Sequence, residues 1–456
     1  FLYPGAKFVP PYEVANSLRF NDGDSGYLER DFSTTQDSRR KFTFSAWVKR
    51  GALGGSLNIW GSSEGSGEGY NSLKFESDDL QFLSGNTSNS GTQVNLVTDA
   101  KFRDPSAWLH VVLAVDSTDG TESNRIKIYV NGSQITSFST STYPSQNTDI
   151  LTSTTPQQTI GMRDLRGTNA QFFDGYMCEV VFIDNQQLTP TSFGEFDSDS
   201  PNVWKPKNVS GLTFGTGGYY LEFKQSGTSQ NSSGLGADTS GNDQHFAVTN
   251  LAATDQSIDT CTNNACTLNP LYRYTNNMTY SEGNLKVVGG GNSWQGANST
   301  FYINKGKWFF EVKFASATDV GNFYIGWTTA GDYNISEPYD NGIHYYNSDG
   351  GEIYANSSAL TTADYGTFAN GNIMGMALDY DNSLLTVYKN GSALVTDYDF
   401  SSATTTAKGG NLVTPTVAHY GSGTVEWNFS SPSYAISSGN TDGNGYGNFE
   451  YPVPSG

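Results

Sequence analysis

The sequence predicts an all-β protein that is divided into two domains. Aromatic residues make up 14% of the chain and charged residues only 15%, and there are 51 glycines. Aromatic side chains suit pleated strands, and glycine suits the turns between them. No long segment places apolar residues at helical spacing. A chain of 456 residues is also too long for one ordinary core.

Two hairpins with nearly the same sequence support the division into two domains. The first spans 113–116 and 126–133, and the second spans 376–379 and 384–392. In each, alternating β-branched and aromatic residues end in Asn-Gly, which tolerates the positive φ that tight hairpin turns need. We therefore predict two β domains of related architecture.

The first domain is predicted over 17–200, after an extended, proline-containing leader at 1–16. Its strand-like stretches are F-T-F-S-A-W-V-K, W-L-H-V-V-L-A-V-D, I-Y-V-N-G and F-D-G-Y-M-C-E-V-V-F. In this order they resemble a laminin G-like domain of the concanavalin A-type jelly-roll superfamily. The resemblance implies a sandwich of two antiparallel sheets, one of which is often concave and able to hold a glycan or a protein.

Residues 201–270 are rich in Gly, Ser, Asn and Asp, with strand-like stretches at 219–223 and 245–248. This composition predicts a partly ordered connector. From 271 onward, G-K-W-F-F-E-V, Y-I-G-W, G-N-I-M-G-M-A-L-D, V-Y-K-N-G-S and V-E-W-N-F resemble a SPRY domain over 271–432. That family has a bent sandwich that binds partners through surface loops. Residues 433–456 form a Gly/Asn-rich tail. The predicted fold is thus two concanavalin A-like jelly-roll sandwiches in tandem.

Charge and hydropathy exclude two classes of partner. The formal net charge is −20, so a phosphate backbone would be repelled and we expect no nucleic-acid binding. No apolar stretch approaches the roughly 20 residues of a membrane helix, so we expect no membrane insertion. Because the sequence starts at Phe1 without Met, we expect its numbering to begin inside a longer or processed product.

The three cysteines are too few for a disulfide framework. Cys261 and Cys266 are spaced to close a small loop in an oxidising setting, whereas Cys178 lies in an apolar stretch and is predicted to be a buried thiol.

No catalytic residues are predicted. Retaining hydrolases of the concanavalin A-like superfamily carry Glu-x-Asp-x-x-Glu on one strand, which places nucleophile and acid on the same face. Two stretches begin this pattern, at Glu76 and Glu195, but Gln81 and Ser200 stand where the second Glu is needed. We therefore expect a protein that is not an enzyme.

Candidate ligand-binding residues are aromatic side chains next to amides and carboxylates, which together can stack on and hydrogen-bond to a glycan. They are Tyr333, Asn334, Tyr339 and Asp340, which follow the strand at Trp327, and Trp294. The alternative is that these aromatic residues anchor long loops.

The cofactor for which several turns offer oxygen ligands is Ca²⁺. The candidate ligands are Asp22, Asp24, Asp116 and Asp119. The alternative is that they are ordinary turn residues, since no complete EF-hand loop is present.

The combination of the two domain types with a Gly/Asn-rich connector resembles large structural proteins of tailed phages of aquatic bacteria. This resemblance implies a virion surface protein, in a tail fibre or capsid fibre, that acts as a lectin-like adhesin in the extracellular medium. Its implied partners are other virion proteins, a host surface glycan or protein, and further copies of the chain, as in a trimer. The alternatives are a purely structural capsid decoration or fibre spacer, and a secreted glycan-active enzyme or carbohydrate-binding module.

Overall fold

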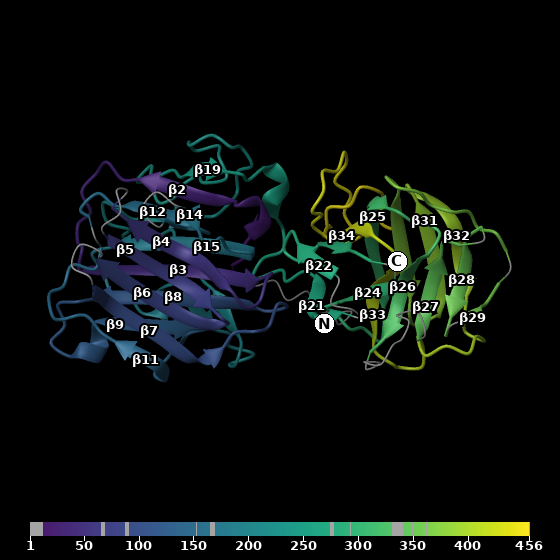
Figure 1. The fold of residues 1–456 in the computed structure, drawn as a ribbon, viewed down its shortest axis with the longest axis horizontal. Coiled ribbons are helices and arrows are strands. Elements are labelled where there is room, and N and C mark those ends of the chain that lie inside the picture. Colours follow the sequence, from purple (N-terminus) through teal and green to yellow (C-terminus); the bar gives the residue numbers. More distant parts are fainter. Residues whose placement is uncertain are drawn as a thin grey trace. The chain divides into compact units, whose positions relative to one another are not determined.

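The computed structural model describes residues 12–64, 69–86, 91–151, 153–164, 169–273, 278–291, 293–330, 341–348, 350–356, 358–361 and 363–455. They form two compact units, Phe1–Asn264 and Ala265–Gly456. In each unit most strands lie in two large sheets (Figure 1). The described helices are four single 3-10 turns, η1 (Asp22–Asp24), η2 (Glu122–Asn124), η3 (Pro190–Ser192) and η4 (Ala253–Asp255). None of the described helices is long and apolar enough to cross a membrane. The predicted all-β fold is confirmed.

The first unit contains two large antiparallel sheets. Sheet I has the order β10 (Ser133–Gln134), β9 (Ile126–Val130), β8 (Trp108–Asp116), β3 (Lys41–Arg50), β15 (Gly175–Asp184), β1 (Ser17–Phe20), β20 (Gln256–Ser257), with β18 (Tyr219–Leu221) also paired to β15. Sheet II has the order β11 (Phe138–Thr142), β7 (Gly91–Lys101), β6 (Asp79–Asn86), β5 (Gly69–Glu76), β4 (Ser56–Ser63), β12 (Gln157–Ile160), β2 (Tyr27–Asp31), β19 (Ala247–Thr249). Two small hairpins are β13 (Arg163–Asp164) with β14 (Asn169–Ala170), and β16 (Gly194–Phe196) with β17 (Trp204–Pro206).

The core of this unit lies between its two sheets. Strand alternation sends Phe42 and Phe44 of β3 inward, where both rings contact Trp60 of β4, at centroid distances of 5.8 and 5.5 Å. All three side chains are fully buried. Burial of such large apolar side chains is the main stabilising contribution to the sandwich.

The segment predicted as a connector folds onto the outer face of sheet I, which is the face turned away from this core. Its apolar residues recur about every five positions, at Trp204, Val209, Phe214 and Tyr220, and all four are buried. They pack in two clusters with outward-facing residues of sheet I, among them Cys178 and Val181 of β15. Residues 201–264, which we call the covering layer, therefore belong to the first unit despite their polar composition. They cover this face of sheet I.

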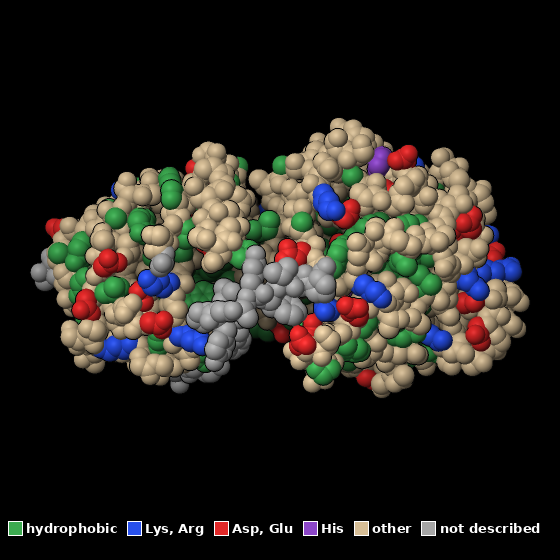
Figure 2. All heavy atoms as spheres, turned by 180° about the vertical axis from the view of Figure 1, so that it is seen from behind, with side chains coloured by type: hydrophobic (Ala, Val, Ile, Leu, Met, Phe, Trp, Pro, Cys, Tyr) green, Lys and Arg blue, Asp and Glu red, His purple; other side chains and the backbone are tan. Residues whose placement is uncertain are grey.

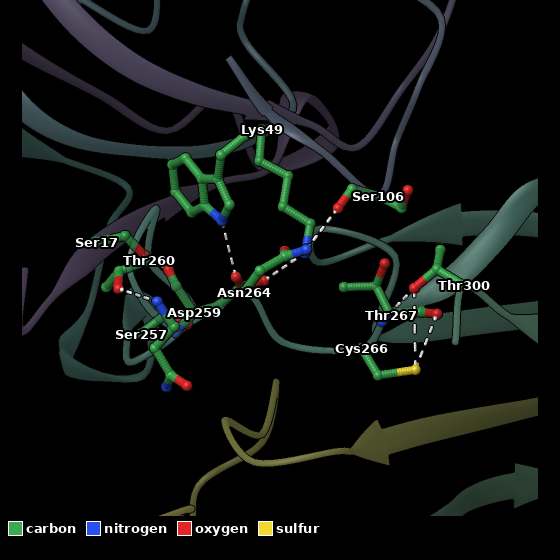
Figure 3. Close-up of polar contacts among 12 residues, drawn as sticks. Ser17, Lys49, Ser106, Ser257, Asp259, Thr260, Asn264, Cys266, Thr267 and Thr300 are labelled. Atoms are coloured by element: carbon green, nitrogen blue, oxygen red, sulfur yellow. Dashed lines mark hydrogen bonds and ion pairs between the residues drawn. The ribbon is translucent and has the colours of Figure 1, made fainter. Parts of the chain in front are cut away.

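A buried ion pair fixes the end of this covering layer. Lys49 of β3 donates to Asp259 Oδ2 at 2.8 Å, and both side chains are at most 2% exposed. Lys49 Nζ also donates to Asn264 Oδ1 at 2.9 Å (Figure 3). Trp108 Nε1 donates to Asp259 Oδ1 at 3.1 Å. Removing either charge would leave the other buried without its counterion.

The second unit is also a sandwich of two antiparallel sheets. Sheet III has the order β21 (Leu268–Arg273), β24 (Trp294–Ser299), β33 (Val413–Tyr420), β26 (Phe323–Thr329), β27 (Gly342–Tyr346), β28 (Glu352–Ala355), β29 (Ser358–Ala359). Sheet IV has the order β22 (Met278–Ser281), β23 (Lys286–Gly289), β34 (Gly423–Asn428), β25 (Lys307–Ala317), β30 (Ile373–Asp379), β31 (Leu384–Lys389), β32 (Ser392–Asp399). Phe310 of β25 contacts Trp327 of β26 across the core, at 5.2 Å.

The paired hairpins seen in the sequence occupy equivalent places in the two units. They are β8–β9–β10 at one edge of sheet I and β30–β31–β32 at one edge of sheet IV. Asn131 and Asn390 both have φ of 48°, and the glycines that follow have φ of 79° and 76°. Positive φ at two successive residues is the requirement for which Asn-Gly is suited. The hairpins are therefore part of the framework in both units.

The Gly/Asn-rich tail packs against the second unit. The Glu311 carboxylate of β25 accepts hydrogen bonds from the backbone N–H groups of Glu450 at 3.0 Å and Tyr451 at 2.9 Å. Asn428 Nδ2 donates to the same carboxylate at 3.0 Å. The tail is thus held on sheet IV by a buried acceptor.

Candidate functional site

Five aromatic side chains lie on the outer face of sheet III. In its central strands, Ile325 and Trp327 point into the core, so the alternate positions point outward. Outward positions on a sheet with a solvated face usually carry polar residues. Here they carry the residues that we call the aromatic patch: Trp294, Tyr324, Tyr346, Tyr354 and Tyr420.

The rings of the aromatic patch form one contiguous surface across neighbouring strands. Tyr324 and Tyr346 stack with centroids 4.0 Å apart and planes 4° apart. Trp294 lies 5.4 Å from Tyr324 and 5.9 Å from Tyr420, and Tyr354 lies 5.1 Å from Tyr346. The edge-to-face and stacked contacts are of the kind that hold aromatic pairs in fixed orientations.

The aromatic patch is partly accessible and has polar groups at its border. Tyr420 is 37% exposed, whereas Trp294, Tyr346 and Tyr354 are half-buried and Tyr324 is buried. Tyr346 Oη donates to Asn322 Oδ1 at 2.8 Å, and Asn322 Nδ2 donates to Asp319 Oδ2 at 2.7 Å. A ligand whose ring has an apolar face can stack on this surface. Hydroxyl groups at the edge of such a ring can reach the amide of Asn322 and the carboxylate of Asp319.

Of the ligand-binding residues predicted from sequence, Trp294 belongs to the aromatic patch. Tyr333, Asn334, Tyr339 and Asp340 lie outside the described residues, in the segment that joins β26 to β27. The four patch tyrosines were not predicted as ligand-binding residues. The signal that could have found them is the alternation of inward and outward positions along a strand. Each tyrosine stands at an outward position near an inward core residue.

The predicted calcium ligands occupy turns. Asp22 and Asp24 lie in η1, where Asp24 Oδ2 accepts a hydrogen bond from Asn21 Nδ2 at 2.8 Å. Asp116 forms an ion pair with Lys41 at 2.7 Å, and Asp119 Oδ1 accepts from the Thr121 N–H at 2.7 Å. No group of three or more His, Cys, Asp or Glu suited to a metal occurs in the described part of the chain. Calcium binding stays a prediction.

Comparison with known families identifies both units. Residues 22–192 match the family model of the concanavalin A-like lectin/glucanases superfamily, and residues 307–432 match that of the SPRY domain. The chain contains a laminin G-like domain followed by a SPRY domain. No curated protein matches the chain. The aromatic patch thus lies on the SPRY domain, and the covering layer closes one sheet face of the laminin G-like domain.

Solved structures with similar folds share little sequence with this chain. The SPRY domain of human HERC1 is 15% identical, with 35% of this chain and 96% of that chain covered and a TM-score of 0.28. A heptameric SAP-like pentraxin from Limulus polyphemus is 15% identical, with coverages of 39% and 80% and a TM-score of 0.30. A putative carbohydrate binding protein from Bacteroides ovatus is 14% identical, with coverages of 52% and 59% and a TM-score of 0.33. We draw no functional conclusion from these likenesses.

The laminin G-like domain contains a Ser–His pair that is not arranged for nucleophilic catalysis. Trp204 Nε1, which can only donate, lies 3.0 Å from His110 Nδ1, so Nδ1 is the acceptor. The proton of the neutral ring is therefore on Nε2, which donates to Ser45 Oγ at 2.8 Å. Burial also lowers the His110 pKa to about 3. This histidine cannot take the Ser45 proton, and the pair is part of the framework.

Glu179 is a buried carboxyl group at a break in β15. It has φ of 52°, where the register with β3 shifts between Cys178 and Val181. Its Oε2 accepts hydrogen bonds from Tyr12 at 2.9 Å and Tyr220 at 2.6 Å. Burial raises the Glu179 pKa to about 7, although these two hydrogen bonds oppose the rise, while Glu222 adds to it and Lys224 opposes it.

This carboxyl group predicts a pH dependence of stability. In the unfolded chain Glu179 loses its proton near pH 4.5, but the folded chain keeps it to about pH 7. The folded state therefore binds more protons in this interval, and the free energy of unfolding should fall by roughly 3 kcal/mol as pH rises through it. We expect Glu179→Gln to remove this loss, as measured by guanidinium unfolding between pH 4 and 8. Parallel wild-type and variant profiles would contradict the assignment.

The three cysteines, all within the described ranges, form no disulfide. Cys178 is buried, as predicted. Cys261 lies beside Cys178, with the two Sγ atoms 3.6 Å apart, while Cys266 Sγ approaches the carbonyl of Thr267 and the hydroxyl of Thr300. The loop predicted between Cys261 and Cys266 is not closed.

Proposed function

We propose that this chain is a non-enzymatic virion surface protein, in a tail fibre or capsid fibre, that binds a host glycan through the aromatic patch of its SPRY domain. The observation that carries the proposal is the contiguous set of five aromatic rings on the outer face of sheet III. Membership of the first domain in a superfamily of lectins and glucanases fits a carbohydrate-binding role.

The chemistry of the aromatic patch favours a sugar over other small ligands. A pyranose has apolar C–H faces and a rim of hydroxyl groups, so it needs flat apolar side chains beside hydrogen-bonding groups. Exposed Tyr420 and half-buried Trp294 provide neighbouring rings, and Asn322 and Asp319 provide polar groups at the border.

Charge narrows the class of glycan to neutral sugars. The chain has a formal net charge of −20, and Asp319 borders the aromatic patch. On the face shown in Figure 2, Lys and Arg side chains are interspersed with Asp and Glu, so no broad basic surface is available there for a polyanion. A sulfated or phosphorylated polysaccharide would be repelled at low ionic strength.

The virion assignment rests on the combination of a laminin G-like domain, a Gly/Asn-rich segment and a SPRY domain in one chain. It implies an extracellular location, contacts with other virion proteins, and assembly with further copies of the chain, as in a trimer. Mass spectrometry of purified particles, with immunogold labelling, tests the location directly. Absence of the chain from intact particles would remove this part of the proposal.

A glycan array tests the binding function. The intact chain should bind one or a few neutral host glycans at micromolar concentration, and binding should persist in physiological salt because it depends on stacking rather than on charge. A chain that is present in the particle but binds neither glycans nor host cells at that concentration would be a structural spacer.

A further inference from the structure

Two cysteines far apart in the sequence lie together in the laminin G-like domain. The Sγ atoms of Cys178 and Cys261 are 3.6 Å apart, although the residues are 83 positions apart in the chain. Cys178 stands in β15, and Cys261 lies in the covering layer on the outer face of sheet I. A disulfide would require the two sulfurs to approach from 3.6 Å to about 2.05 Å.

The backbone on both sides of this contact is held in place. Thr260 and Asn263 exchange backbone hydrogen bonds, both of 3.1 Å, which close a tight turn around Cys261. Before the turn, Asp259 is bound by Lys49, and within it Thr262 Oγ1 accepts from the Val14 N–H at 3.0 Å. The turn therefore presents Cys261 to Cys178 as a fixed neighbour, which makes their effective concentration high.

The surroundings of the two thiols suit a structural disulfide better than a catalytic or redox-sensing cysteine. Trp47, Trp108 and Tyr176 pack in the same apolar cluster. Burial raises the pKa of both thiols, which keeps them protonated at neutral pH. A catalytic or redox-sensing cysteine needs the opposite, a stabilised thiolate.

We propose that Cys178 and Cys261 form an intrachain disulfide when the chain is exposed to an oxidising medium, which would fasten the covering layer to sheet I. This proposal does not depend on the proposed function. During refolding with oxidised glutathione as the oxidant, before the apolar cluster closes over the thiols, Cys261 loses its proton and its thiolate attacks one glutathione sulfur, which releases one glutathione thiolate. The Cys178 thiolate then attacks the Cys261 sulfur and releases the second. The protein loses two protons and two electrons, and one glutathione disulfide becomes two thiols.

The test is a refolding of the full chain with reduced and oxidised glutathione, followed by digestion without reductant and mass spectrometry. The expected result is a peptide pair joined through Cys178 and Cys261. Because the bond closes a long loop of the unfolded chain, adding a reductant should lower the Tm of this domain by roughly 10 °C.

Three single variants make the outcome specific. Cys266→Ser should keep both the linked peptide pair and the reductant-dependent shift in Tm. Cys178→Ser and Cys261→Ser should lose both while still folding under reducing conditions, as judged by circular dichroism. A peptide pair joining Cys261 to Cys266, or three unmodified thiols after refolding in oxidised glutathione, would overturn the proposal.

Discussion

Replacing Asp259 with Ala should lower the free energy of unfolding of the laminin G-like domain by about 3–5 kcal/mol. Asp259 is the counterion of buried Lys49 and the acceptor for Trp108 Nε1. The substitution leaves a buried ammonium group without its carboxylate counterion. Equilibrium unfolding in guanidinium measures the loss as a lower midpoint.

Two further variants separate the buried charge from other effects of this substitution. The double variant Lys49→Met with Asp259→Asn removes both charges and keeps an oxygen for Trp108, so it should cost only about 1 kcal/mol. The surface pair of Lys101 and Asp79 serves as the matched control, since Lys101 is 38% exposed. Lys101→Met should cost less than about 1 kcal/mol. If Asp259→Ala cost no more than this control, the ion pair would not be what fixes the covering layer.

Replacing residues of the aromatic patch should weaken glycan binding without unfolding the SPRY domain. Tyr420 is the exposed member of the patch, and the ring of half-buried Trp294 lies 5.9 Å from it. We expect Trp294→Ala and Tyr420→Ala each to weaken binding about 10-fold, and the double variant about 100-fold, because each removes an anchor ring. Isothermal titration with the best glycan from the array measures these changes.

The matched control for these variants is Trp308→Ala. Trp308 is 40% exposed and stands in β25 of sheet IV, the other sheet of the same domain. Its replacement removes an equally large exposed aromatic side chain and should leave the Kd unchanged. Equal losses for Trp308 and Trp294 would indicate a nonspecific effect on the fold, and unchanged affinity in both would move the site elsewhere.

The two sandwich folds could be predicted from the sequence because apolar residues recur in their motifs with the period of a β-strand. The stretch from Phe42 to Arg50, the two Asn-Gly hairpins and the apolar run around Cys178 all form the predicted strands. In each, local propensity and the final packing agree, so the pattern was informative.

The segment predicted as a connector shows where composition misleads. Short strands were predicted at 219–223 and 245–248, and β18 and β19 form there, but the polar composition gave no sign that Trp204, Phe214 and Tyr220 hold this segment on sheet I. A few widely spaced apolar residues were enough to bury it, because sheet I already offered an apolar outer face. That face depends on the register of β15 and β3, which sequence alone does not reveal.

The candidate site was predictable only in part for a related reason. Trp294 was predicted because it stands beside amides in a short polar stretch, whereas Tyr324 and Tyr346 stand within apolar strands. Which side of the sheet each tyrosine occupies depends on strand order, and residues 294, 324, 346, 354 and 420 become neighbours only once β24, β33, β26, β27 and β28 are aligned. Sequence spacing carries no information on that alignment.

A crystal structure of the chain with an oligosaccharide chosen from the glycan array would show directly whether the aromatic patch binds the sugar. A sugar ring should stack on Trp294 and Tyr420, with its hydroxyl groups within hydrogen-bonding distance of Asn322 or Asp319. Density for the sugar on the laminin G-like domain, or on the SPRY domain away from sheet III, would contradict the assignment of the aromatic patch as the binding site.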